Sequence, residues 1–180
     1  MATPNKIMLI RHGEKPVTPP PNGVTEDGTQ DEHSLVVRGW QRAGALVGFF
    51  SAPTRTGIAE PRTIFASGTT EDPSIPADIA KSLRPQETVS ALCRKMGLAA
   101  ITAITVGDEE RLIESIRSTS GPVLVSWEHK HIPSIAAGFM NNPPDWGDRF
   151  DAVWILDLQP DGSYKLSIVN QDLLDGDAPA

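Results

Sequence analysis

The stretch KIMLIRHGEKP, residues 6–16, decides how the rest of the sequence is interpreted. Its four consecutive apolar residues, from Ile7 to Ile10, predict a buried β-strand. Arg11 and His12 follow directly, although a cation and an imidazole are costly to bury. A core strand that ends on these two residues indicates that its end forms the floor of a polar site.

Length and composition narrow the class of protein. A chain of 180 residues with 39% hydrophobic residues predicts a single domain over residues 1–180 with a sizeable core. No apolar stretch reaches about 18 residues, so no membrane span is expected. The first residues, MATPNK, lack the features of a secretory signal, and we expect a cytoplasmic protein. The net charge of −7, with no basic stripe, argues against a nucleic-acid partner.

Strands alternate with helices along most of the chain. Strands are predicted at 6–10, 63–67, 100–104, 121–127, 151–158 and 163–170, and helices at 38–50, 86–98, 108–120 and 132–140. The last two strands are joined by Pro160-Asp161-Gly162, which is a hairpin turn signal. We therefore expect an α/β fold: a three-layer α/β/α sandwich around a mostly parallel sheet with an antiparallel strand.

Two long segments rich in proline and glycine, 14–37 and 68–80, are predicted to be loops. Loops of this length are often functional, and we expect these two to set the specificity of any site that they border. Residues 141–151 also read as a loop, and we expect a plain connector there rather than a segment that overhangs a pocket.

The unusual residues gather at the ends of predicted strands. Arg11 and His12 follow the first strand, Ser67 follows the second, and His129 follows the strand at 121–127. Arg84 lies just before a predicted helix. Because ligands bind beyond the carboxyl ends of parallel strands, we expect these residues to meet at one edge of the sheet.

Four segments, in this order, resemble the histidine phosphatase superfamily, which is also called phosphoglycerate-mutase-like. The signature Arg-His-Gly is present as RHGE at residues 11–14. The segment LVVRGWQRAGALVGFF is similar to the one that follows the family's signature. SLRPQETVSAL resembles the family's second arginine at the start of a helix, and VLVSWEHKHIP resembles the late strand that carries its second histidine. The resemblance spans essentially the whole chain and implies the same three-layer fold.

The resemblance also implies roles for the matching residues. His12 would attack phosphorus and become phosphohistidine, and His129 would stabilise the charge on the equatorial oxygens. Arg11 and Arg84 would bind the phosphate, because a guanidinium offers a planar fork of donors that suits phosphate oxygens. His129 would share in binding the phosphate, and neither a metal nor a cofactor is expected.

A leaving alkoxide or phenoxide needs a proton from a general acid. The family usually takes this acid from the stretch between the second arginine and the second histidine. Glu109 in GDEERL is our first candidate, followed by Asp108 and Glu110. Glu14 is a further candidate because it lies beside the predicted nucleophile.

The chain departs from two branches of the family. Lys15 and Thr18 stand where the mutases usually carry a serine or threonine and then an asparagine, and the spacing from Ser67 to Arg84 is longer than in mutases. Lys130 stands where the acid phosphatases carry an aspartate. We therefore expect a phosphatase that hydrolyses a phosphate monoester, on either a small metabolite or a phosphoprotein. The alternatives are a mutase-type phosphotransferase and a silent member that binds phosphorylated ligands.

Other kinds of site have less support in the sequence. His129 and His131 form a His-x-His pattern that could ligate a metal with His33, but no third ligand is near in sequence. Cys93 is the single cysteine, which excludes an internal disulfide, and we expect it to be buried in a helix. P-loop and serine-hydrolase motifs are absent.

Overall fold

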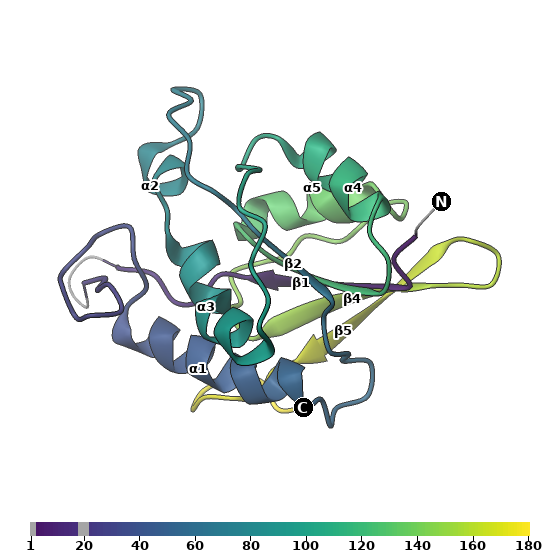
Figure 1. The fold of residues 1–180 in the computed structure, drawn as a ribbon, viewed down its shortest axis with the longest axis horizontal. Helices are drawn as coiled ribbons and strands as arrows, with labels where there is room; N and C mark the ends of the chain where they lie inside the picture. The colour runs from purple at the N-terminus through teal and green to yellow at the C-terminus, as the bar shows by residue number, and fades with distance from the viewer. Residues whose placement is uncertain (1–2, 18–21) are drawn as a thin grey trace.

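The apolar run that opens the sequence forms the central strand of a mixed five-stranded sheet (Figure 1). The computed structural model describes residues 3–17 and 22–180. The strands lie in the order β2-β3-β1-β4-β5. They are β1 (Lys6–Arg11), β2 (Thr63–Ala66), β3 (Pro122–Trp127), β4 (Ala152–Leu158) and β5 (Tyr164–Asn170).

Strand β1 lies where the sheet changes from parallel to antiparallel pairing. It pairs parallel with β3, which pairs parallel with β2, and it pairs antiparallel with β4. The turn around Gly162 joins β4 to β5 as an antiparallel hairpin, as the sequence predicts. One strand, β4, therefore runs against the other four, and the expected mostly parallel sheet with an antiparallel strand is confirmed.

Helices cover both faces of the sheet, as Figure 1 shows. They are α1 (Val37–Ser51), α2 (Ala77–Ala80), α3 (Arg84–Met96), α4 (Glu109–Arg117) and α5 (Ile132–Ala137), with a 3-10 turn, η1 (His129–His131), before α5. Ile7 and Leu9 face the core formed with α4 and α5, whereas Met8 and Ile10 face the core formed with α1 and α3. Both faces of β1 are buried, which explains why its sequence is apolar without alternation.

Two parts of the chain differ from the sequence prediction. Residues 100–104 do not form a strand: the chain meets β2 and the residues after it only at isolated bridges, Phe65 with Ile101 and Gly68 with Thr105. Strand β2 is only four residues long, so it offers a short edge for pairing. The segment 68–80, expected as a loop, contains the short helix α2. Residues 18–21, including Thr18, lie outside the described part.

No helix among the described residues is long and apolar enough to cross a membrane. 

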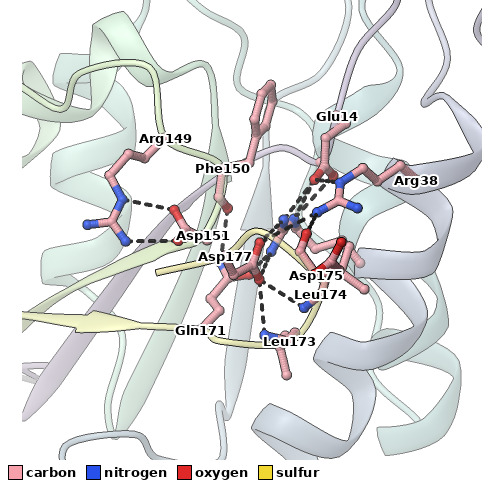
Figure 2. Close-up of polar contacts among 12 residues, drawn as sticks. Glu14, Arg38, Arg149, Phe150, Asp151, Gln171, Leu173, Leu174, Asp175 and Asp177 are labelled. Carbon is pink, nitrogen blue, oxygen red and sulfur yellow. Dashed lines mark hydrogen bonds and ion pairs between the residues drawn. The ribbon is translucent and has the colours of Figure 1, made fainter. Parts of the chain in front are cut away.

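The C-terminal segment after β5 lies against helix α1, where Asp177 comes close to Arg38 and Glu14 (Figure 2). The Arg42 side chain is 2% exposed and donates hydrogen bonds to Asp177, Glu14 and Gln171. Arg38 forms ion pairs with the same two carboxylates, at 3.3 Å from Glu14 and 3.9 Å from Asp177. Residues from the two ends of the chain thus share one buried ionic cluster.

Asp177 is also bound by the backbone. Its carboxylate accepts hydrogen bonds from the amides of Leu173 and Leu174, each at 3.0 Å. Burial acts to raise the pKa of Asp177, but these bonds and those from Arg42 outweigh it and lower the pKa to about 2. The ionised form is therefore favoured in the folded protein.

We expect the Asp177→Asn substitution to destabilise the protein by about 2 kcal/mol at neutral pH, because it removes this favoured charge. A lowered pKa contributes stability that is present above about pH 4 and is lost as the pH falls toward about 2. Urea unfolding across this range should show a smaller loss for the variant than for the wild type. Asp175→Asn, at an exposed side chain, is the control and should behave as the wild type. Equal acid sensitivity in wild type and Asp177→Asn would contradict the assignment.

Candidate active site

The carboxyl ends of the three parallel strands meet at one level. Arg11, the last residue of β1, lies opposite Trp127, the last residue of β3, and Ala66 of β2 lies opposite Ser126. The His12 amide then donates to the Trp127 carbonyl at 3.1 Å, which extends the pairing by one residue. The residues that follow the three strands therefore leave the sheet side by side, as expected for a ligand site in this class of fold.

The imidazole of His12 is held in one tautomer by the backbone carbonyl of Gly13. The side chain is buried, with 3% of the residue exposed, and Nδ1 lies 2.7 Å from the carbonyl oxygen of Gly13. A carbonyl only accepts hydrogen bonds, so Nδ1 carries the proton and Nε2 carries a free lone pair. Burial, and then Arg84 and Arg11, lower the pKa of His12 well below its ordinary value. The ring is therefore neutral, which is the state that a nucleophile requires.

The backbone around Gly13 is held between two helices. Its amide donates to Oγ1 of Thr88 at 2.8 Å, and the Thr88 hydroxyl donates to the carbonyl of Arg84 at 2.7 Å. On the other side the chain lies against Gly39 of α1, where an added Cβ would come within 2.7 Å of the Glu14 carbonyl oxygen. The glycine allows this close approach, and together the contacts fix the chain beside the nucleophile.

Arg84 is the first residue of α3, and only 4% of it is exposed. Its guanidinium donates to the carbonyls of Asp78, at 2.6 Å, and Glu32, at 3.3 Å. Its Nε has no hydrogen-bond partner within the protein. Burial lowers the pKa of Arg84, and nearby carboxylates act in the opposite direction. A buried arginine with a free donor is suited to bind an anion.

Arg11 has an environment similar to that of Arg84 and also acts on His12. It is 4% exposed, it donates to the Asp148 carbonyl at 2.5 Å, and its guanidinium carbon lies 3.8 Å from the centre of the Phe150 ring. Its Nε also has no partner within the protein. The loop at 141–151, expected as a plain connector, thus contacts the site through Asp148 and Phe150. Burial lowers the pKa of Arg11, while Glu128 is the strongest of the charges that raise it.

His129 follows β3 and begins the 3-10 turn η1. Its Nδ1 lies 2.7 Å from Oε1 of Glu128 as a close contact, and its Nε2 lies 3.7 Å from Oδ1 of Asp148. Burial and then Arg11 lower the pKa of His129, and the carboxylates of Glu128 and Asp148 partly compensate. The second histidine is thus buried, and Arg11 is close enough to lower its pKa.

A narrow pocket of about 10 Å³ opens beside the nucleophile. It is lined mainly by polar side chains, and the buried hydroxyl of Ser82 in it has no partner within the protein. Arg11 and His129 are not part of the lining. The lining residues are His12, Lys15, Ser67, Asp78, Ile79, Ser82, Arg84, Pro85, Val106 and Glu128.

Glu109, the first candidate for the general acid, does not line this pocket. Its carboxylate accepts hydrogen bonds from Trp127 Nε1 at 3.0 Å and from the Gly107 amide at 3.1 Å, and it lies 3.1 Å from Nδ1 of His131. Burial acts to raise the pKa of Glu109, but these contacts outweigh it and lower the pKa. The sequence suggested Glu109 as the general acid, whereas in the structure its carboxylate binds the side chains of Trp127 and His131.

The other three candidate acids are also placed away from this pocket's lining. Glu14 forms ion pairs with Arg42 and with Arg38, and Figure 2 shows Glu14 and Arg38 side by side. Asp108 lies 3.7 Å from Arg111 with a half-exposed side chain, and Glu110 is exposed. None of the four acids suggested by the sequence therefore lines the pocket.

The histidines do not form a metal centre with other residues. Within residues 3–17 and 22–180, no three His, Cys, Asp or Glu side chains lie close enough together to hold a metal ion. His131 is instead paired with Glu109, and His33 lies 3.6 Å from Glu32.

The overall structure is similar to solved structures of known proteins. One is the protein histidine phosphatase SixA complexed with tungstate, with a TM-score of 0.59 and 11% identity over 92% of this chain and 97% of that one. The chain has the histidine phosphatase fold. A second is a putative alpha-ribazole-5'-P phosphatase from Escherichia coli K-12, with a TM-score of 0.56 and 14% identity over 94% of this chain and 97% of that one. No family model and no curated protein matches the sequence.

Sequence reasoning missed Glu128, Ser82, Asp148 and Phe150. Glu128 directly precedes His129, a predicted site residue, and follows a predicted strand. This position in the sequence could have identified it as a candidate site residue. Ser82 had no signal, because it lies in the segment between Ser67 and Arg84 whose course the sequence does not reveal.

We expect Thr88→Val to lower stability by about 1–3 kcal/mol, because the buried Gly13 amide loses its acceptor. Thermal unfolding measures this loss, and hydrogen exchange should become faster at the Gly13 amide in particular. Thr88→Ser keeps the oxygen and should restore slow exchange. Unchanged exchange in Thr88→Val would show that this bond does not hold the backbone.

We expect the pKa values of His12 and His131 to be shifted in opposite directions. His12 should stay neutral, with its proton on Nδ1, even at a pH well below the ordinary pKa of histidine. The hydrogen bond to Glu109 raises the pKa of His131, so His131 should still be protonated at a pH just above the ordinary pKa of histidine. Nitrogen-15 NMR of the rings, assigned with His12→Asn and His131→Asn, measures both. An ordinary titration of His12 would contradict the structure.

Proposed function

We propose that this protein is a member of the histidine phosphatase superfamily and hydrolyses a phosphate monoester through a phosphohistidine on His12. The observation that carries the proposal is a buried, neutral imidazole with a free Nε2, close enough to two buried arginines for both to lower its pKa. Within the described part of the chain, the Nε–H of each arginine has no hydrogen-bond partner. The fold supports it, because a structure with the same fold is that of a protein histidine phosphatase complexed with tungstate, an oxyanion.

The chemistry follows from the positions of these groups. Nε2 of His12 attacks phosphorus, forming a P–N bond as the bond from phosphorus to the leaving oxygen breaks. Arg11, Arg84 and His129 stabilise the charge on the three remaining oxygens, which is the main requirement in phosphoryl transfer. Water then attacks phosphorus and the P–N bond breaks. Inorganic phosphate is released and the neutral imidazole is regenerated. The substrate is a phosphorylated small molecule or a phosphoprotein.

Rapid quenching during turnover of a phosphorus-32-labelled substrate should trap label on the protein. The P–N bond is labile in acid and survives base, so acid should remove this label, unlike that of phosphoserine. His12→Ala should abolish both label and turnover, whereas His33→Ala, outside the pocket, should retain both. Acid-stable label, or label retained in His12→Ala, would overturn the proposal.

His129→Ala should keep the nucleophile but lose a donor to the transition state. We expect kcat to fall by about 10²–10³-fold, which is typical when one such donor is removed. Vanadate, which mimics the trigonal phosphoryl group, should inhibit the wild type, and turnover should survive EDTA. Loss of turnover with EDTA and its recovery with zinc would instead point to a metal-dependent enzyme. Binding of a phosphorylated ligand without turnover would point to a silent member of the superfamily.

A further inference from the structure

Glu128 is a buried carboxylate in a pocket that is otherwise suited to anions. Only 7% of the residue is exposed, and it lines the same pocket as His12 and Arg84. Asp78 is the other acidic residue in the described lining, but it is exposed on α2. A carboxylate in such a place is costly, because it competes with a phosphate for the same positive charges. Its presence therefore requires an explanation.

The carboxylate is held in a fixed orientation by its neighbours. Oε2 accepts a hydrogen bond from the Lys130 amide at 2.7 Å, and Oε1 lies 2.7 Å from Nδ1 of His129. Glu128 directly follows β3, which is buried along its length, so its backbone position is set by the sheet. A group fixed in this way is organised before the reaction begins, as a catalytic group must be.

A substrate bound to the two arginines would bring a second anion close to Glu128. Its carboxylate acts on both Arg11 and Arg84. A phosphate dianion brought to these arginines would interact with the same positive charges and would add a second anion beside the Glu128 carboxylate. Two adjacent anions favour sharing of one proton between them. The complex therefore takes up one proton from solvent with the substrate and holds it between the phosphate and the carboxyl group.

We propose that Glu128 is the general acid of the reaction proposed above, on which this inference rests. As Nε2 of His12 forms its bond to phosphorus, the proton on the Glu128 carboxyl passes to the leaving oxygen, which departs as a neutral alcohol. The resulting carboxylate then takes a proton from the water that attacks the phosphohistidine, and the P–N bond breaks. Each turnover thus regenerates the neutral His12 imidazole and the Glu128 carboxyl group, whose proton returns to solvent when phosphate is released.

The test is a series of phosphate esters whose leaving groups range from nitrophenol to simple alcohols. Only a basic leaving group needs the proton, so Glu128→Gln should lower kcat/KM for alkyl esters by about 10²–10⁴-fold and for nitrophenyl phosphate by less than about 10-fold. Glutamine keeps the shape and an acceptor for the Lys130 amide. The dependence of rate on leaving group should therefore be shallow in the wild type and steep in the variant.

Three variants serve as matched controls. Asp78→Asn tests the other acidic residue of the lining, Asp148→Asn tests the carboxylate near His129, and Glu109→Gln tests the acid suggested by the sequence. Each should leave the leaving-group dependence as it is in the wild type. Circular dichroism and thermal unfolding verify that the variants fold. If Glu128→Gln does not fold, Glu128→Asp is the second variant, because it keeps the carboxyl group but places it farther from the substrate. It should also lower kcat/KM more for alkyl than for aryl esters.

Several outcomes would overturn the inference. An equal loss on all esters would show that Glu128 only caps η1 or balances charge, and a uniform gain would show that it only repels substrate. A steep dependence in one of the controls would move the role to that residue. Failure of the proposed function is distinct, because the wild type would then yield no acid-labile phosphoenzyme, even with nitrophenyl phosphate.

Discussion

The hydrogen bond between Nδ1 of His12 and its neighbouring carbonyl at Gly13 is the interaction on which the rest of the site depends. It places the single ring proton on one nitrogen and leaves the other with a free lone pair, and burial keeps the ring neutral. This bond requires a particular path of the backbone directly after a buried strand. Helix α3 fixes that path through the hydroxyl of Thr88, and helix α1 fixes it through the close approach of Gly39. The two helices on one face of the sheet therefore act on the chemistry through the backbone rather than through side chains in the pocket.

Burying two arginines beside this ring creates an electrostatic problem that the fold solves without a direct ion pair. Arg11 and Arg84 donate to backbone carbonyls, which supply partial charge but no full counter-charge. Burial accordingly acts to lower the pKa of both, and Glu128 is the buried acid that acts on both. In the reaction that we propose, this carboxylate becomes surplus negative charge once a phosphate group binds to the two arginines. A surplus anion in a buried site is relieved most simply by a proton, which links the stability of the pocket to its proposed chemistry.

The sequence predicts most of the fold and only part of the site, and the difference has a physical cause. Buried strands and amphipathic helices are determined by local patterns, so β1, α1, α3 and the β4–β5 hairpin are found where the patterns place them. Residues 100–104 have the apolar character of a strand but meet their neighbour only at isolated bridges, which no local pattern reveals. Arg11, His12, Arg84 and His129 stand at ends of elements, where position in the sequence implies position in space. Glu109 was suggested for the same reason, but its direction is decided by Trp127 and His131, which approach it from other segments.

The position of β1 at the change from parallel to antiparallel pairing explains why distant segments reach the site. The carboxyl ends of β1, β2 and β3 share one edge, and an antiparallel strand begins at the edge where its neighbour ends. Ile10 pairs with Val153, so the residues just before β4 arrive beside Arg11, and this is how Asp148 and Phe150 come to contact it. Strand β5 runs back to that edge, which brings the C-terminal segment to the same place and allows Asp177 to meet Arg42 and, through it, Glu14. The segment that follows the nucleophile is thus held by the last residues of the chain. The reversal of strand direction at β4 therefore has two effects. It brings Asp148 and Phe150 into contact with Arg11, and it brings the C-terminal segment to the residues that follow His12.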